Sequence, residues 1–240
     1  MWHGMTLAVV LPTYNEAGSI ADCIKGFEAL GIVDDIVVVN NNAHPDTSPA
    51  VAATSAREVF ETEQGYGAAI RRGFRETADA DLVCVCEPDG TFEAADILKL
   101  LPYTNDVQVA FGSRTVQTFI LSGANMGWFL RWGNWAVAKM TEVLFNTVYL
   151  SDVGCTFRVM RRRTIDEMTP HFRGIASSFG FEMMLIAAQM RMTLVQVPVK
   201  YQARVGHSSV TGDHGAAVKL GLEMIALALR ERIRPRTRRR

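Results

Sequence analysis

The chain has 240 residues and equal numbers of basic and acidic side chains, 25 of each, so its formal net charge at pH 7 is zero. Nucleic-acid binders are usually basic over a whole face, so this balance argues mildly against that class. Hydrophobic residues make up 48% of the chain and charged residues 21%, which is ordinary for a globular protein of one large domain or two small ones.

The four cysteines, Cys23, Cys84, Cys86 and Cys155, show no four-ligand zinc spacing, and this usage fits a reducing compartment. The sequence does not start with a basic region and a long apolar stretch, which is the pattern of a signal peptide. It also has no uninterrupted apolar run of about 18 residues, so a membrane-spanning helix is not expected. We therefore expect a cytoplasmic protein.

Apolar runs alternate with segments of helical spacing through the first half of the chain. Buried strands are predicted at residues 7–11, 35–39, 82–86 and 107–111, and helices at 19–30, 48–56, 65–78 and 96–101. Strands that alternate with helices in this way are typical of a parallel sheet with helices on both faces. The predicted fold class is therefore α/β, with a mostly parallel sheet.

The second half of the chain is more helical. Helices are predicted at residues 119–149, 179–190 and 216–233, and a strand at 194–201, where Pro198 suggests a sheet edge. The last seven residues, 234–240, hold five arginines and are expected to form a basic disordered tail. We expect one domain over residues 1–233, followed by this tail.

Polar clusters follow three of the predicted strands, at residues 13–16, 40–42 and 87–91. In open parallel sheets, ligands bind beyond the carboxyl ends of the strands. Three such clusters at three strand ends indicate a binding site better than any one of them would.

The first candidate for chemistry is Glu87-Pro88-Asp89, just past a buried strand. Two carboxylates this close can share a hard cation, and Mg²⁺ usually takes one or two carboxylates together with substrate phosphates. Such a metal would neutralise charge on a leaving diphosphate. The alternative is a solvated acidic turn, because Pro-Asp-Gly is a common turn sequence.

Four arginines form the second candidate set: Arg114, Arg131, Arg158 and Arg204. Guanidinium groups clamp phosphates well because they are planar, multidentate and always charged. Each arginine taken singly fits an ordinary surface residue, but glycine or small polar residues beside three of them favour a functional role.

Asp152 is a further candidate, as a general base, an acceptor for a sugar hydroxyl, or a turn residue at a helix end; spacing alone favours the last. The turn Gly65-Tyr66-Gly67 does not match the dinucleotide pattern of three glycines, because Ile70 stands at the third position. The sequence therefore lacks the main motif that would indicate a dehydrogenase.

Taken in order, these segments resemble the inverting family 2 glycosyltransferases of the GT-A fold, and in particular the dolichyl- or polyprenyl-phosphate sugar synthases. The similarity spans residues 6–210 and is strongest as an ordered set. Its motifs lie at residues 9–16, 35–42, 65–73, 87–89, 112–114, 152–158, 179–182, 197–199 and 204–208.

The resemblance implies a role for each motif. It implies a nucleotide-sugar half over residues 6–115 and an acceptor half over 116–233. Nucleotide binding is implied for Pro12, Thr13, Tyr14, Glu16, Asn40, Asn41, Gly67, Arg71, Glu87 and Pro88; catalysis for Asp89, Arg114 and Asp152; and acceptor binding for Arg131, Arg158, Arg204 and Ser208. The implied cofactor is Mg²⁺ or Mn²⁺, held by Glu87 and Asp89.

This chain departs from the family pattern at three places. Asn40 and Asn41 replace an acidic pair that contacts the nucleotide base, and an asparagine can donate as well as accept hydrogen bonds. The choice between uridine and guanosine nucleotides therefore stays open. Glu87 replaces the first aspartate of the metal motif, and Ser209 replaces a lysine.

The expected reaction is a single inverting displacement at the sugar C1 by an acceptor. A lipid phosphate acceptor, with a second pKa near 6, is already largely anionic at pH 7 and needs positioning more than a base. A hydroxyl acceptor needs a base, for which Asp152 is the candidate. A protein that binds nucleotide sugars without turnover is the alternative from another class.

Contact with a membrane is expected at the end of the chain. The predicted helix 216–233 and the arginine tail suit the anionic inner face of a membrane, although a packed C-terminal helix with a frayed tail explains them equally well.

Overall fold

A computed structural model describes residues 1–124, 126–206 and 214–234. In these residues a seven-stranded sheet has the order β3-β2-β1-β4-β6-β5-β7. The strands are β1 (Leu7–Thr13), β2 (Asp35–Asn40), β3 (Arg57–Phe60), β4 (Leu82–Val85), β5 (Val109–Ser113), β6 (Arg158–Arg161) and β7 (Leu194–Pro198). All pairs are parallel except those of β6, which runs antiparallel to both β4 and β5.

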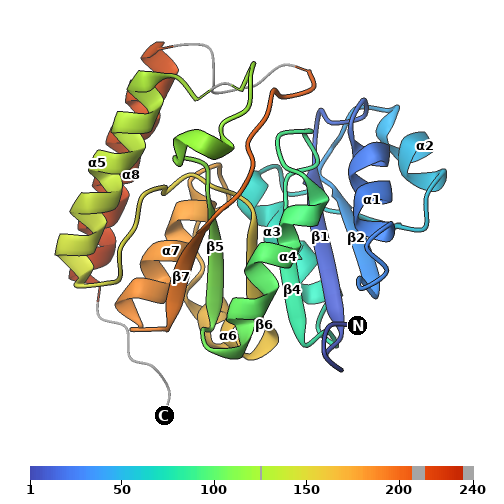
Figure 1. Cartoon of the computed structure of the whole chain (residues 1–240), viewed down its shortest axis with the longest axis horizontal. Coiled ribbons are helices and arrows are strands. Elements are labelled where there is room, and N and C mark those ends of the chain that lie inside the picture. Colours follow the sequence, from blue (N-terminus) through green and yellow to red (C-terminus); the bar gives the residue numbers. More distant parts are fainter. Residues whose placement is uncertain (125, 207–213, 235–240) are drawn as a thin grey trace.

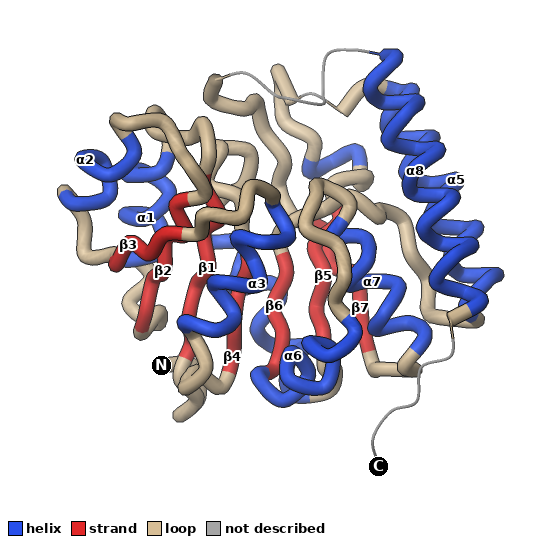
Figure 2. The backbone as a smooth tube through the Cα atoms, turned by 180° about the vertical axis from the view of Figure 1, so that it is seen from behind, coloured by secondary structure: helices blue, strands red, loops and turns tan. Residues whose placement is uncertain are grey.

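Helices cover both faces of the sheet, as Figure 1 and Figure 2 show from opposite sides. One face packs against α1 (Ile20–Glu28), α2 (Thr47–Ala52) and α4 (Ile97–Leu100), and the other against α3 (Tyr66–Glu76), α6 (Arg162–Met168) and α7 (Phe179–Gln189). Single 3₁₀ turns lie at Ala94–Asp96, Leu101–Asn105, Gln117–Phe119 and Thr169–His171.

The central strand β1 is buried on both faces because its side chains alternate between two hydrophobic clusters. Val9 belongs to the cluster under α1, and Val10 to the cluster under α3. At Gly73 of α3, a Cβ atom would collide with the Val10 side chain, so the glycine lets this helix approach the strand closely.

Two long helices, α5 (Trp128–Phe145) and α8 (His214–Ile233), lie side by side at the β7 end of the sheet (Figure 1 and Figure 2). They bury Val137 and Ala138 of α5 and Met224 and Ala228 of α8. Large hydrophobic side chains of the two helices are nevertheless exposed, at Trp128, Phe129, Trp132, Trp135, Val143, Val218, Leu222, Leu229 and Ile233.

The predicted α/β class, with a mostly parallel sheet and helices on both faces, is confirmed. Pro198 lies in the edge strand β7, also as predicted. The predicted helix over 119–149 is wrong at both ends, because α5 begins only after Gly127 and ends at Asn146, which adopts a left-handed conformation. Strands β3 and β6 and helix α6 are missing from the sequence prediction. Most of the arginine tail, from residue 235 on, lies outside the described residues.

Candidate active site

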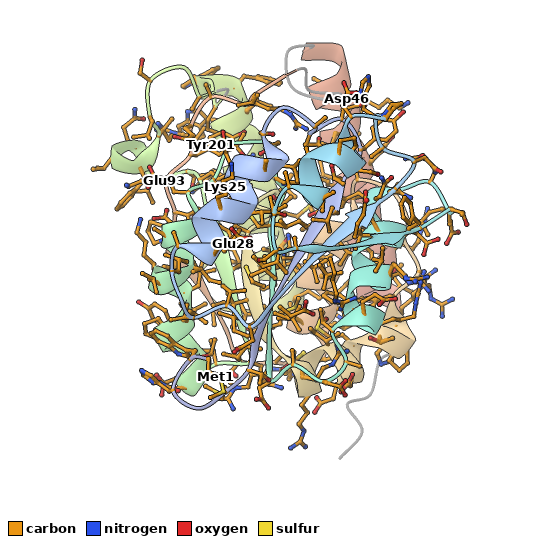
Figure 3. All side chains as sticks on the ribbon, turned by 90° about the vertical axis from the view of Figure 1, so that its right-hand side faces the viewer. Met1, Lys25, Glu28, Asp46, Glu93 and Tyr201 are labelled. Carbon is orange, nitrogen blue, oxygen red and sulfur yellow. The ribbon has the colours of Figure 1, made fainter. Side chains whose placement is uncertain are left out.

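A cavity of about 1170 Å³, the main cavity, opens beyond the carboxyl ends of β1 and β4. Tyr201, one of its lining residues, lies toward the upper end of the molecule in Figure 3, opposite Met1. Its polar lining includes Thr13, Tyr14, Asn15, Glu16, Asn41, Gln64, Glu87, Asp89, Arg114, Asn134 and Arg204. About half of its apolar lining residues come from α5 and α8.

The turn after β1 is organised by the carboxylate of Glu16. One oxygen, Oε2, accepts hydrogen bonds from the backbone N–H groups of Tyr14 (2.7 Å) and Asn15 (2.9 Å), and from the hydroxyl of Thr13 (3.3 Å). These bonds fix Thr13 and Tyr14 at the rim of the main cavity. Pro12, Thr13, Tyr14 and Glu16, expected at the nucleotide, all line this cavity.

Arg204 joins this turn to the loop after β4. Its guanidinium lies 2.7 Å from Glu16 Oε1 and 3.1 Å from Asp89 Oδ2. The backbone N–H of Val205 also donates to the carbonyl of Asp89, at 2.9 Å. Sequence reasoning assigned Arg204 to the acceptor, but in this structure it lies among the carboxylates expected at the donor.

The Glu87-Pro88-Asp89 segment contacts this arginine through Asp89. Asp89 is buried, and its Oδ1 accepts hydrogen bonds from the backbone N–H and the hydroxyl of Thr91, at 2.9 and 2.6 Å. The carbonyl of Pro88 accepts a bond of 2.6 Å from Ser19 Oγ, which anchors the segment to α1. Burial, followed by the negative charge of Asp89, raises the pKa of Glu87 to about 8.

These residues fit a divalent cation. The two carboxylates repel each other, and a guanidinium already compensates one of them, so the site attracts positive charge. In the part of the chain that the structure describes, no group of three or more His, Cys, Asp or Glu side chains could hold a metal alone. Glu87 and Asp89 would therefore hold the ion together with oxygen atoms of a diphosphate.

Arg114, which also lines the main cavity, forms a closely fitted pair with the buried Asp152. The guanidinium binds both carboxylate oxygens, at 2.8 and 2.9 Å, and the backbone N–H groups of Arg114 and Gly154 each donate at 2.9 Å. A Cβ atom on Gly154 would lie 2.7 Å from the Arg114 guanidinium, so glycine makes room for it. The ring of Tyr201 lies 5.3 Å from Arg114 Cζ.

This geometry does not suit the general base that the sequence suggested at Asp152. Its side chain is fully buried and accepts four hydrogen bonds. Burial alone would raise the pKa of the Asp152 carboxyl, but the charge and hydrogen bonds of Arg114 outweigh it and hold that pKa below its ordinary value. Asp152 is therefore better suited to orienting Arg114, which lines the main cavity.

Arg158 was expected at the acceptor, and the structure contradicts this. Its side chain is only 1% exposed, and it donates to the carbonyls of Cys155 (2.5 Å), Thr156 (3.3 Å) and Gly180 (2.7 Å). Burial lowers the pKa of this guanidinium. It lies over the ring of Phe111, 5.3 Å from Cζ to the centroid. Arg158 thus ties β6 to the start of α7 and is not among the residues that line the main cavity.

Arg131 also lies away from the other arginines. It does not line the main cavity but a smaller one of about 380 Å³, the outer pocket, which also contains Trp132, Trp135 and Tyr149. Its guanidinium donates to Gln117 Oε1. Arg131 and Arg204, both expected at the acceptor, therefore line different cavities in this structure.

The two asparagines after β2 have different surroundings. Asn40 binds Glu58 and the backbone of Ala43, at 2.8 Å each, and does not line the main cavity. Asn41 does line it, but its amide is fully engaged with the neighbouring loop. Its Nδ2 donates to the carbonyls of Glu61 and Glu63, at 2.8 Å each, and its Oδ1 accepts from Gly65 at 2.7 Å.

Gly67 and Arg71 of α3 are not among the lining residues either. At Gly67, a Cβ atom would lie 2.8 Å from the carbonyl oxygen of Gly174, and its N–H donates to the carbonyl of Ile175 at 2.7 Å. Gly67 therefore allows α3 to pack under the loop before α7. Ser208 lies outside the described residues.

Two features of the site were missed from the sequence. The hydroxyl of Tyr66, which lines the main cavity, is buried and has no hydrogen-bond partner among the residues that the structure describes. The apolar wall from α8 was also missed, although the residues 216–233 were recognised as a helix. Periodicity reveals a helix, but it does not indicate which cavity the helix faces.

Comparisons with known proteins agree with the resemblance seen in the sequence. A family model described as "Glycosyl transferase family 2" matches residues 8–169. A dolichyl-phosphate hexose transferase from Haloferax volcanii is 27% identical over 235 residues, which cover 95% of this chain and 96% of that protein. The low-salt glycan biosynthesis hexosyltransferase Agl6 from the same organism is 29% identical over 212 residues, 85% of this chain, which spans only 50% of that protein.

Solved structures share the fold. Glucosyl-3-phosphoglycerate synthase from Mycobacterium tuberculosis, solved with Mn²⁺, UDP and glucosyl-3-phosphoglycerate, superimposes with a TM-score of 0.75. The match covers 97% of this chain and 82% of that one, at 17% sequence identity. The expected GT-A fold is thereby confirmed.

Proposed function

We propose that this chain, which belongs to glycosyl transferase family 2, moves a sugar from a nucleotide-sugar donor to the phosphate of a polyprenyl or dolichyl lipid. The observation that carries the proposal is the division of the main cavity into a charged end and an apolar end. The charged end holds Glu16, Glu87, Asp89 and Arg204. The apolar end is lined by Leu130, Ala136, Val137, Val218, Leu222 and Ile225 of α5 and α8.

The donor is proposed to bind at the charged end. The turn after β1 and the loop held by Asn41 would receive the base and ribose, because both border the cavity at that end. A divalent metal, Mg²⁺ or Mn²⁺, supplies positive charge to the departing diphosphate when it is bound. Glu87 and Asp89 would hold it, and Arg204 would turn from Asp89 toward the phosphates.

The acceptor phosphate is proposed to bind near Arg114. A phosphate monoester is largely anionic at pH 7, so it attacks without giving up a proton to a base. This agrees with an Asp152 that is buried and whose pKa is lowered. Asp152 holds Arg114 in place, and Arg114 positions the phosphate in line with the sugar C1, on the side opposite the diphosphate.

The lipid chain is proposed to follow the apolar wall between α5 and α8. A polyprenyl chain is long and apolar, and burying it against such a wall favours binding in proportion to the buried area. A relative that covers nearly the whole chain carries the name dolichyl-phosphate hexose transferase, which supports this acceptor class.

The acceptor also suggests a location, the inner face of a membrane. None of the helices in the described residues combines the length and apolar character needed to cross a bilayer. We propose that the protein reaches the lipid by peripheral contact through the exposed aromatic side chains of α5.

The test is to incubate the purified chain with UDP- and GDP-sugars, Mg²⁺ or Mn²⁺, and polyprenyl phosphate, and to look for the glycosylated lipid by mass spectrometry. The proposal predicts a lipid-linked sugar with at least one donor. It fails if no donor gives this product, or if sugar moves only to hydroxyl acceptors.

A further inference from the structure

We propose that the outer pocket binds the phosphate headgroup of an anionic membrane lipid, at a place separate from the sugar-transfer site. The pocket has a volume of about 380 Å³. Helix α5 forms a wall between the two cavities, because Leu130, Gly133 and Val137 line the main cavity, whereas Arg131 and Trp135 line the outer pocket.

The polar groups of the outer pocket suit a phosphate. The hydroxyl of Ser113 lies 3.0 Å from that of Thr115 and 2.8 Å from that of Ser151, and all three line the pocket with Arg131. Each hydroxyl can rotate to donate a hydrogen bond, and a guanidinium supplies fixed, charged donors. A phosphate can accept from several of these groups at once.

The charge of the pocket also fits an anion. No acidic side chain is found among its lining residues. In the ranges that the structure describes, the hydrogen-bond partner of the Arg131 guanidinium is the neutral side chain of Gln117. A bound phosphate would therefore meet a positive charge that no carboxylate of the pocket lining compensates.

Exposed aromatic rings surround the mouth of this pocket. Trp132 is 50% exposed, Trp135 43% and Tyr149 69%, and Trp128, one turn before Trp132, is 74% exposed. The rings of Trp132 and Trp135 pack edge to face, 5.4 Å apart. Large exposed aromatic patches mark interaction surfaces, and tryptophan and tyrosine favour the headgroup level of a bilayer.

The two observations together indicate a bilayer rather than a soluble ligand or a protein. A pocket for one phosphate beside several exposed tryptophans matches a lipid, whose headgroup is anionic and whose neighbouring chains are apolar. Lys139 lies 3.6 Å from the ring of Tyr149, but its ammonium is paired with Glu142 at 2.6 Å, so the positive charge offered to a lipid comes from Arg131. With α5 on the membrane surface, the main cavity lies on the other side of that helix.

The test measures sedimentation of the full chain with vesicles of phosphatidylcholine, with and without one third phosphatidylglycerol. We expect clear binding only to the anionic vesicles. Arg131→Gln should weaken it by roughly five- to tenfold, which corresponds to losing about 1 kcal/mol or slightly more for a basic residue at the surface. Arg163→Gln, which removes an exposed arginine of α6, is the matched control and should bind like the parent.

Further measurements keep the outcome clear. The melting temperature of Arg131→Gln should match that of the parent. Weaker vesicle binding by this variant then cannot result from unfolding. Replacing Trp132 and Trp135 together by alanine should also weaken binding to anionic vesicles. The proposal is overturned if both arginine variants bind equally, or if the parent binds neutral and anionic vesicles alike.

The same protein variants also test two other ligands of the outer pocket and its aromatic rim, a soluble phosphate and a second copy of this chain. If glycerol phosphate or inorganic phosphate binds in an Arg131-dependent way while anionic vesicles do not, the pocket serves a soluble phosphate and the lipid assignment is wrong. If light scattering finds a dimer that the tryptophan variant converts to monomer, and vesicles are not bound, the face joins two copies of the chain and the assignment is equally wrong.

Discussion

The guanidinium of Arg204 lies 3.1 Å from the carboxylate of Asp89, the residue proposed to bind the metal. A second contact, 2.7 Å to Glu16, keeps the arginine in this position. Without a donor, the positive charge that faces Asp89 thus comes from the protein itself. A metal ion entering the site competes with this arginine, whereas a metal that arrives with a diphosphate offers the arginine a new anionic partner.

The first prediction follows from this competition. Arg204→Ala should bind Mn²⁺ more tightly than the parent when no nucleotide is present, by roughly five- to thirtyfold, which corresponds to one charged contact of about 1–2 kcal/mol. The same variant should bind a nucleoside diphosphate with metal more weakly. Calorimetry of each titration checks both effects, and an unchanged Mn²⁺ affinity would show that Arg204 does not occupy the metal position.

The second prediction concerns the pair of Arg114 and Asp152. Asp152→Asn should destabilise the fold by roughly 3–5 kcal/mol at neutral pH, because it leaves a buried guanidinium without its counter-charge. The pKa of Asp152 is lowered on folding, so its contribution is present above the ordinary aspartate pKa and is lost as the pH falls through the folded value. The stability gap between variant and parent, measured by urea unfolding, should therefore narrow below about pH 4. A gap that stays constant with pH would contradict this role.

The third prediction concerns Glu87, whose effect on the pH dependence of stability is opposite to that of Asp152. Its pKa is raised to about 8 in the fold, so the folded state binds more protons than the unfolded state between the ordinary glutamate pKa and about 8. The stability of the metal-free protein should fall as the pH rises through this window. Glu87→Gln removes the effect, so its melting temperature should exceed that of the parent increasingly up to pH 8, by roughly 2–4 °C for each kcal/mol regained. Equal slopes of melting temperature against pH would refute the raised pKa.

A fourth prediction tests the loop held by Asn41. Asn41→Asp replaces two donated hydrogen bonds with a carboxylate that faces the carbonyls of Glu61 and Glu63. We expect a loss of roughly 1–3 kcal/mol in stability and weaker nucleotide binding through a displaced loop. Asn105→Asp, at an exposed position outside the lining of the main cavity, serves as the control. Full nucleotide affinity in the Asn41 variant would mean that the loop has no part in the donor site.

The sheet could be predicted where strands are apolar and buried on both faces, as in β1 and the four-residue β4. Strand β1 forms an unbroken apolar run, but β3 is short and only partly buried, and β6 carries arginines at both ends. Local composition did not reveal these two strands, because their place depends on pairing with β2 and with β4 and β5.

The candidate site shows a similar limit. Residues 87–89 and the turn at Glu16 could be found, because their chemistry lies in adjacent residues at strand ends. The sequence could not show which arginines bind a ligand and which have a structural role, since a guanidinium binds a phosphate and a set of backbone carbonyls equally well. Arg158 donates hydrogen bonds to the backbone carbonyls of Cys155 and Gly180. These contacts depend on the fold and cannot be read from the sequence.

The central claim is that one cavity joins a charged donor end to an apolar lipid end, and the dependence of transfer on acceptor chain length tests it most directly. The account predicts that kcat/KM rises at least tenfold from a single-isoprene phosphate to a long polyprenyl phosphate, since each buried CH₂ contributes about 0.8 kcal/mol. Replacing Leu130 and Leu222 of the apolar wall by serine should remove most of this rise, while Leu229→Ser, at an exposed position of α8 outside the cavity lining, should preserve it. Equal kcat/KM for short and long acceptors in the parent would contradict the account.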